Sequence, residues 1–153
     1  MSSTESRKGQ KGVLEKYDRN YDEKEFVRAY MEKKNIDTIS KALAQLRKEI
    51  PLEKYFQTEI RKTLRKKYPD ALIRKIAQGA YSEAGIPDLM MIYRGHYFGW
   101  EIKRPVFGEP SKLQRRTIAE IERAGGTAAF VTWPEECIHI IERWEEEERC
   151  YHR

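Results

Sequence analysis

The sequence predicts an α/β fold, in which a mixed central β-sheet is flanked by helices and preceded by an N-terminal helical extension. From residue 51 onward the hydrophobic periodicity indicates the order helix, three strands, helix, strand, helix. The segment 88–93 is apolar on both faces, which is typical of a central strand covered on both sides. The chain has 153 residues, of which 39% are hydrophobic, and this is enough for one domain of ordinary size with a buried core.

The first 50 residues differ in pattern from the rest. Residues 1–12 are polar and rich in Ser, Lys and Gly, so we expect a disordered tail. Residues 13–50 predict two short helices joined near Asn35, the first with a capping-box pattern from Asp22 to Glu25. This helical extension has too few apolar residues for a core of its own, so we expect it to pack on the main domain or on a partner chain.

Residues 51–153 form the predicted main domain. Its first helix carries an apolar side chain every fourth residue and is stopped by Pro69; the apolar residues are Leu52, Phe56, Ile60 and Leu64. The remaining predicted elements are strands at 71–77, 88–93 and 97–103, a helix at 111–124, a strand at 127–133 and a last helix from Pro134.

Basic residues are concentrated in the first half of the chain. The net charge is +5, but residues 1–75 hold 20 basic and 12 acidic side chains. Seven of the basic residues fall between positions 61 and 75 with one acid, namely Arg61, Lys62, Arg65, Lys66, Lys67, Arg74 and Lys75. Such a cluster suits a polyanion such as nucleic acid, and a solvated helix face is the alternative interpretation.

Three other classes of protein are disfavoured. No apolar run is long enough to span a membrane and no signal-peptide pattern is present, so we expect a cytoplasmic protein. Two cysteines are too few for a disulfide framework. The pairs Cys137-x-His139 and Cys150-x-His152 do not predict a zinc site, because residues two apart on a helix point in different directions.

Asp88 and Glu101 stand on two strands that a very short turn must join. If the turn has two or four residues, paired positions have numbers that sum to 189, and Asp88 lies directly across from Glu101. A three-residue loop would place the two acids on opposite faces of the sheet. We expect an even turn, in which case two carboxylates lie side by side and their repulsion must be offset.

Lys103 shares a face with Glu101, but one ammonium cannot neutralise two partly desolvated carboxylates. A divalent cation such as Mg²⁺ could, since it takes oxygen ligands and is often held by one or two carboxylates with substrate phosphates. Gly99 leaves space beside the pair because it has no side chain on this face. A solvent-exposed strand with an ordinary Glu–Lys contact is the simpler alternative.

Two further polar residues fall at positions where a role in the site is open. Glu59 lies at the edge of the apolar stripe of its helix, from which its carboxylate could reach over the sheet or into solvent. Gln114 falls on the apolar face of its helix and needs a partner there. Because 111–114 also matches the capping-box pattern S-x-x-Q, Gln114 could equally serve as a helix cap.

These residues resemble the VRR-NUC family, a branch of the PD-(D/E)XK nucleases with a restriction-endonuclease-like core. The resemblance spans about Phe56 to Trp144 and leaves residues 1–50 outside. It rests on Gly85-Ile86-Pro87-Asp88, Glu101-Ile102-Lys103, Gln114 and Gly125-Gly126, with Glu59 as the upstream helical acid.

The resemblance implies hydrolysis of DNA phosphodiester bonds with Mg²⁺ or Mn²⁺. Asp88, Glu101 and the Ile102 backbone carbonyl would bind the metal, and Glu59 would act through a water or a second cation. Lys103 would orient and help deprotonate the attacking water, and Gln114 would position water or a phosphate oxygen. Candidates for gripping the DNA backbone are Arg61, Arg65, Lys66, Lys67, Lys75 and Arg104.

Small stand-alone members of this family resemble Holliday-junction resolvases, which implies a homodimer acting on branched DNA in a repair setting, encoded by a bacterium or a phage. The helical extension would then serve in dimerisation or DNA contact, and a helix-turn-helix reader is the narrower possibility. Two alternatives stand beside this interpretation: a sequence-specific endonuclease of restriction or homing type, and a DNA-binding module that keeps the fold without catalysis.

Overall fold

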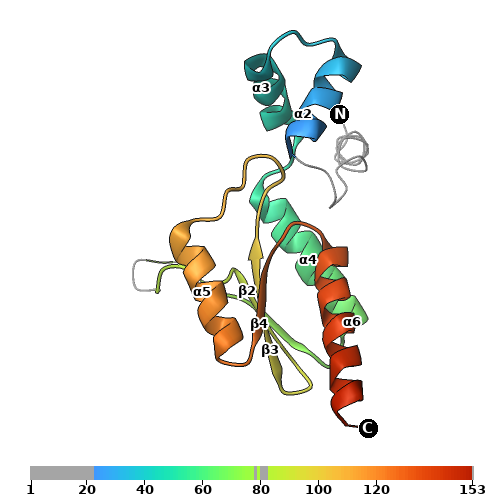
Figure 1. Cartoon of the computed structure of the whole chain (residues 1–153), viewed down its shortest axis with the longest axis vertical. Helices are drawn as coiled ribbons and strands as arrows, with labels where there is room; N and C mark the ends of the chain where they lie inside the picture. The colour runs from blue at the N-terminus through green and yellow to red at the C-terminus, as the bar shows by residue number, and fades with distance from the viewer. Residues whose placement is uncertain (1–22, 78, 80–82, 153) are drawn as a thin grey trace. The chain divides into compact units, whose positions relative to one another are not determined.

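The structure, a computed structural model, describes residues 23–77, 79 and 83–152 (Figure 1). The predicted tail at 1–12 and the predicted cap at Asp22 lie outside the described residues. The described chain divides into two units, which are taken in turn: residues 23–52 with Arg104–Phe107, and a sheet unit made of the remaining residues from Glu53 onward. Among the described helices, none has the length and apolar character needed to cross a membrane.

The first unit contains α2 (Glu23–Lys34) and α3 (Ile39–Glu49). Asn35 ends α2 with a φ of 53°, a left-handed conformation that Asn tolerates better than most residues. Thr38 caps α3, and its side-chain oxygen accepts a hydrogen bond from the Lys41 backbone N–H at 3.3 Å. The buried side chains on the two helices are Phe26, Val27, Tyr30, Ala42 and Leu46.

The sheet unit is built on four strands in the order β1-β2-β3-β4. They are β1 (Leu72–Lys75), β2 (Leu89–Tyr93), β3 (His96–Ile102) and β4 (Thr127–Val131). The pairs β1–β2 and β2–β3 are antiparallel, whereas the pair β3–β4 is parallel. A parallel pair requires a crossover connection, which α5 (Lys112–Arg123) supplies. The predicted mixed α/β fold is therefore confirmed.

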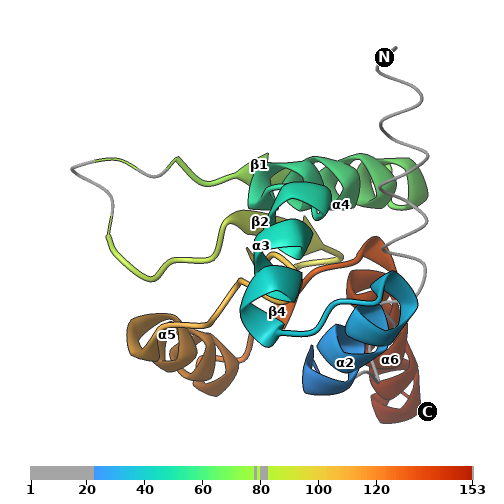
Figure 2. The same ribbon diagram turned by 90° about the horizontal axis from the view of Figure 1, so that it is seen from above.

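Helices cover both faces of this sheet. In Figures 1 and 2, α5 lies on one face, while α4 (Glu53–Lys67) and α6 (Pro134–Tyr151) lie on the other. The largest fully buried side chains of the unit include Phe56, Ile60 and Leu64 of α4, Phe98 and Trp100 of β3, and Ile141 of α6. Their apolar contacts form the core that holds the sheet rigid under the polar residues described next.

The hairpin between β2 and β3 has the predicted even turn. Arg94 and Gly95 both have positive φ (49° and 76°), as a two-residue turn of type I′ requires. Tyr93 pairs with His96 and Leu89 with Trp100, so that paired numbers sum to 189. Continuing this register by one residue places Asp88 across from Glu101.

Candidate active site

A pocket of about 740 Å³ opens within the sheet unit where β2 begins and β3 ends. Every charged or amide side chain in its lining comes from α4, α5 or the strands and their continuations. The residues that line it are Glu53, Gln57, Lys75, Ala77, Asp88, Glu101, Lys103 and Gln114. The structure thus brings together four residues that the sequence predicts for catalysis, Asp88, Glu101, Lys103 and Gln114.

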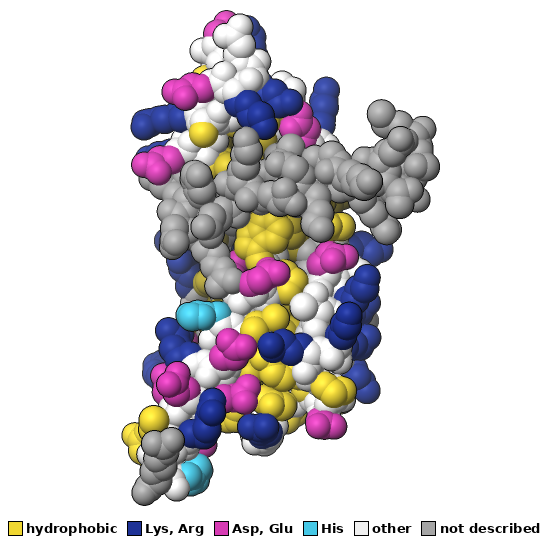
Figure 3. All heavy atoms as spheres, turned by 90° about the vertical axis from the view of Figure 1, so that its right-hand side faces the viewer, with side chains coloured by type: hydrophobic (Ala, Val, Ile, Leu, Met, Phe, Trp, Pro, Cys, Tyr) yellow, Lys and Arg dark blue, Asp and Glu magenta, His cyan; other side chains and the backbone are white. Residues whose placement is uncertain are grey.

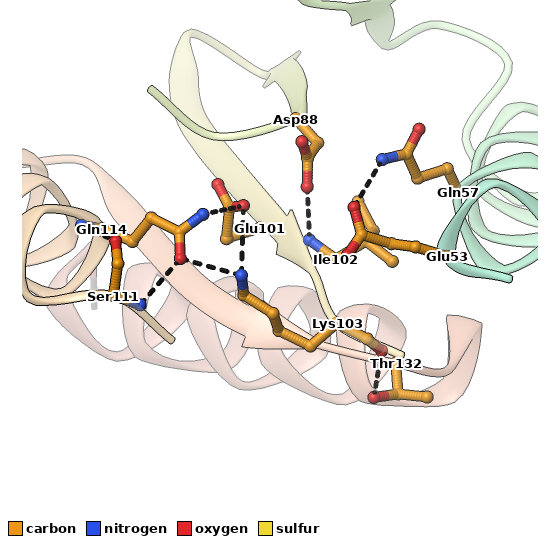
Figure 4. Close-up of polar contacts among 9 residues, drawn as sticks. All are labelled: Glu53, Gln57, Asp88, Glu101, Ile102, Lys103, Ser111, Gln114 and Thr132. Carbon is orange, nitrogen blue, oxygen red and sulfur yellow. Dashed lines mark hydrogen bonds and ion pairs between the residues drawn. The ribbon is translucent and has the colours of Figure 1, made fainter. Parts of the chain in front are cut away.

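Asp88 and Glu101 are the two buried charged residues among the described residues, with 7% and 3% of their surface exposed. Oδ2 of Asp88 accepts a hydrogen bond from the Ile102 backbone N–H at 2.9 Å (Figure 4). The Asp88 carboxylate, just before β2 begins, therefore accepts the hydrogen bond that a backbone carbonyl of the neighbouring strand would otherwise accept from Ile102. Since the N–H and C=O of one residue in an antiparallel ladder point to the same neighbour, the Ile102 carbonyl also lies on the Asp88 side.

The two carboxylate oxygens of Glu101 have different surroundings in the part of the chain that the structure describes. Its Oε1 accepts a hydrogen bond from Gln114 Nε2 at 2.8 Å and lies 3.9 Å from the Lys103 ammonium. Its Oε2 is buried, and among the described residues no N–H or O–H group donates a hydrogen bond to it; its neighbour is the Asp88 carboxyl group. Burial, and next the neighbouring Asp88 carboxylate, raise the pKa of Glu101 to about 8.

Gln114 belongs to the site and to the helix cap at once. Its Oε1 accepts hydrogen bonds from the Lys103 ammonium at 2.8 Å and from the Ser111 backbone N–H at 3.0 Å. In return, the Ser111 hydroxyl oxygen accepts from the Gln114 backbone N–H at 3.1 Å, which completes the capping box of α5. The side chain of Gln114 therefore caps α5 and lines the pocket, and its role in catalysis stays a prediction.

Lys103 is held by its backbone as well as by its side chain. Its backbone N–H donates to the Val131 carbonyl at 2.9 Å, and its own carbonyl accepts from the Thr132 hydroxyl at 2.9 Å. These bonds extend the parallel β3–β4 pairing by one residue, and the ammonium points toward Gln114 and Glu101 (Figure 4). Lys75, at the end of β1, adds a second lysine to the lining.

The acid that α4 contributes to the pocket is Glu53, which the sequence reasoning missed, and not Glu59. Glu53 and Gln57 lie one turn apart, and Gln57 Nε2 donates to Glu53 Oε1 at 3.3 Å. Burial, and next the Asp88 charge, raise the pKa of Glu53. Glu59 is six residues further along, about two-thirds of a turn around the helix from Glu53, and is absent from the lining.

The sequence suggests that Gly99 leaves open space beside the two acids, but Pro87 occupies this space in the structure. A side chain added to Gly99 would place its Cβ 2.9 Å from Cγ of Pro87. Because Gly99 has no side chain, the ring of Pro87, the residue before Asp88, can pack against the sheet at this position. Gly85 plays a similar part, since an added Cβ would lie 2.8 Å from Leu113 Cγ on α5 and its φ is +88°.

The residues predicted to contact the DNA backbone are dispersed over α4, β1 and the loop 104–107. Lys75 lines the pocket, whereas Arg65 donates to the Ile73 carbonyl at 3.2 Å and Lys67 lies 3.5 Å from Glu142. Arg61 is half-buried and Lys66 is exposed, and both lie outside the pocket lining. Arg104 belongs to the other unit, where its guanidinium donates to backbone carbonyls.

The acidic pair fits a divalent cation only with help from other ligands. Among the described residues no three His, Cys, Asp or Glu side chains are grouped so that they could hold a metal alone. Asp88, Glu101 and the Ile102 carbonyl leave room for water or phosphate oxygens, which is how proteins commonly hold Mg²⁺. Glu101 Oε2, to which no described N–H or O–H group donates, is the oxygen that such an ion would satisfy.

Comparisons with known proteins gave one structural likeness. The sequence matches no protein-family profile and no curated protein. A solved structure described as "VRR_NUC domain" is similar with a TM-score of 0.45 and 24% sequence identity, over 56% of this chain and 92% of that chain. Any conclusion about chemistry therefore depends on the geometry of the pocket.

Proposed function

We propose that this chain is a metal-dependent endonuclease that hydrolyses phosphodiester bonds in DNA. The observation that carries the proposal is the buried pair Asp88–Glu101, with a carboxylate oxygen that no described N–H or O–H group satisfies, beside the linked Lys103 and Gln114 side chains. Two carboxyl groups buried side by side destabilise a sheet when both are ionised, so their retention in a polar pocket favours a functional role.

The metal ligands would be Asp88, Glu101 and the Ile102 carbonyl. When bound, Mg²⁺ or Mn²⁺ would supply Lewis-acid stabilisation of the phosphoryl oxygens and a lowered pKa for water. The Ile102 N–H fixes the Asp88 carboxylate in this position, and Gln114 fixes that of Glu101. Both acids are therefore oriented before a ligand arrives, which is the requirement for electrostatic preorganisation.

Lys103 would orient the attacking water and stabilise the charge that develops on the phosphorane. Its ammonium is held between Gln114 Oε1 at 2.8 Å and Glu101 Oε1 at 3.9 Å, so little reorganisation is required. Glu53 and Gln57 provide an acceptor and a donor on the opposite wall, where a second water can be held. Lys75 would contact the scissile or the neighbouring phosphate.

The surface beyond the pocket would contact the DNA backbone. Figure 3 shows the face formed by α4 and α6, where lysine and arginine side chains gather along α4, while acidic and basic side chains are mixed on α6. The exposed basic residues of α4 are Lys54, Lys62, Arg65, Lys66 and Lys67. Binding through such residues would weaken steeply as salt is added.

We further propose a preference for branched DNA, such as Holliday junctions, and a homodimer with two active sites. The support is the resemblance given above and the symmetry of junction cleavage, which requires two sites. Cleavage of four-way junctions, flaps and linear duplex with Mg²⁺ or Mn²⁺, with the mass of the protein in solution measured alongside, would test both points. Equal cutting of every substrate would refute the structural preference.

Variants of the pocket test the nuclease itself. Asp88→Asn, Glu101→Gln and Lys103→Ala are each expected to lower the cleavage rate by about 10²-fold or more, the usual cost of removing one transition-state contact. Arg116→Ala, which removes a surface charge paired with Glu120, serves as the control. Unchanged cleavage in Lys103→Ala and Asp88→Asn would mean that the site is elsewhere.

The same panel separates the alternatives. A preferred cut position on plain duplex, independent of branches, would identify a sequence-specific endonuclease. Binding of DNA without cleavage under any metal would identify a non-catalytic module.

A further inference from the structure

The loop that follows Lys103 leaves the sheet unit and joins the helical extension. Arg104–Phe107 groups with residues 23–52, and the chain returns to the sheet unit at Gly108. The loop thus departs directly after Lys103 and returns three residues before Ser111. Lys103, which directly precedes the loop, donates to Gln114 Oε1 at 2.8 Å, and Gln114 follows the loop on α5, six residues after Gly108.

Arg104 binds the C-terminal end of α3. Its Nε donates to the Pro51 carbonyl at 2.8 Å, and its Nη2 donates to the carbonyls of Arg47 at 2.7 Å and Ile50 at 2.5 Å. Carbonyls at a helix C-terminus lack intrahelical partners and carry partial negative charge, so a guanidinium is the matching group. Its planar set of donors reaches three acceptors at once, which a lysine ammonium on a single atom does less well.

Phe107 strengthens the same attachment. Its ring centroid lies 4.5 Å from the guanidinium carbon of Arg47 and 4.7 Å from that of Arg104, both within cation–π range. One aromatic ring therefore contacts two like-charged groups and offsets part of their mutual repulsion.

The loop between these two residues has a strained backbone. Val106 has a φ of 67°, and the Phe107 N–H donates to the Pro105 carbonyl at 2.8 Å, which is a γ-turn centred on a β-branched residue. A β-branched residue rarely adopts positive φ, and such a conformation persists only where its surroundings enforce it. Arg104 and Phe107 flank the turn and supply that enforcement.

We propose that Arg104 and Phe107 are positioning residues, which fix the loop 104–107 on the helical extension and thereby set the placement of Lys103 relative to Gln114. The kinetic part of this inference depends on the proposed nuclease function, whereas the geometric part does not.

If Arg104 contacted a DNA phosphate instead, its removal would have different kinetic effects from the removal of a positioning residue. A guanidinium that contacts phosphate contributes to affinity, so its removal raises KM and makes the dependence of binding on salt shallower by about one phosphate contact. A guanidinium that positions the loop contributes to the rate, so its removal lowers kcat. Small misplacements of catalytic groups cost up to about 10²-fold in rate.

Full-length Arg104→Ala and Arg104→Lys provide the kinetic test, with Arg116→Ala as the matched charge control. We expect kcat for DNA cleavage to fall by about 10- to 100-fold in both Arg104 variants, with KM and the salt dependence of DNA binding unchanged. Lysine keeps the charge and can contact phosphate, so recovery of activity in Arg104→Lys would overturn the proposal. A raised KM with unchanged kcat, or no change at all, would overturn it too.

A spectroscopic measurement tests the geometry without cleavage. In ¹⁵N-labelled protein the side-chain amide of Gln114, which donates to Glu101, gives its own resonances. We expect Arg104→Ala and Phe107→Ala to move these resonances while the fold, judged by cooperative thermal unfolding, is kept; Arg116→Ala should leave them in place. Unmoved resonances in folded Arg104 variants would refute the positioning role even if the protein proves to have no nuclease activity.

Discussion

Glu101 is a buried carboxyl group that faces a second carboxyl group, so its protonation links the stability of the site to pH. Its pKa is raised from the ordinary value of 4.5 to about 8 in the absence of metal, and the folded state therefore binds this proton more tightly than the unfolded state. The stabilisation from this proton is complete below about pH 4.5 and is lost as the pH rises through about 8.

We therefore expect the melting temperature of the metal-free protein to fall between pH 5 and pH 8. Glu101→Gln, which keeps an acceptor but cannot ionise, should flatten this pH dependence, whereas Lys112→Gln on the surface should not. Added Mn²⁺ should raise the melting temperature more at pH 8 than at pH 5, because the ion competes with the proton. A pH dependence that is the same in Glu101→Gln and in the unaltered protein would count against the raised pKa.

At the scale of the helix, one side chain of α5, Gln114, takes part both in the N-terminal cap and in the contacts with Lys103 and Glu101. Ser111→Ala removes the N-cap acceptor, so we expect a loss of about 1 kcal/mol in the free energy of unfolding. Cleavage should also fall, since Gln114 then has one fewer constraint while it holds Lys103 and Glu101. Ser111→Thr keeps the hydroxyl and should restore both the stability and the rate; a loss of stability alone in Ser111→Ala would show that the cap and the site act separately.

Two acids on α4 offer a further comparison. Glu53 lines the pocket and Glu59 does not, so we expect Glu53→Gln to lower cleavage by about 10-fold or more and Glu59→Gln to retain most of it. Steady-state rates at saturating metal would show the difference. The opposite result would restore Glu59 as the helical acid.

The sequence contains a signal for Glu53 that the apolar stripe alone does not reveal. Glu53 lies in line with Phe56, Ile60 and Leu64, at the start of the buried face, where an acid is unexpected. Periodicity identifies the buried face of a helix, but which end of that face meets the sheet terminus depends on tertiary packing. For this reason Asp88 and Glu101 could be paired from the turn length, whereas the acid from α4 could not be chosen.

At the scale of the whole molecule, the sequence predicts the sheet better than the connections between its units. The turn at Arg94–Gly95 is a local feature, and the strand register that it predicts agrees with the structure. Arg104 follows Lys103 directly in the chain, and sequence position alone suggests that it shares the pocket. Its attachment to α3 depends on contacts with residues about 50 positions away, which no local pattern reports.

The two-residue turn of the β2–β3 hairpin also bears on how the chain folds. Hairpins closed by such turns form in about microseconds, long before a parallel pair such as β3–β4 can be completed through its crossover helix. We therefore expect the two acids to meet while most of the sheet is unformed, and their repulsion to oppose this early event. We expect the refolding rate to increase with added Mn²⁺ or at mildly acidic pH, and Asp88→Asn to refold faster than the unaltered chain in stopped-flow fluorescence without metal. Equal refolding rates would place the meeting of the two carboxylates after the rate-limiting step, so the chemistry of the pocket would carry no kinetic cost in folding.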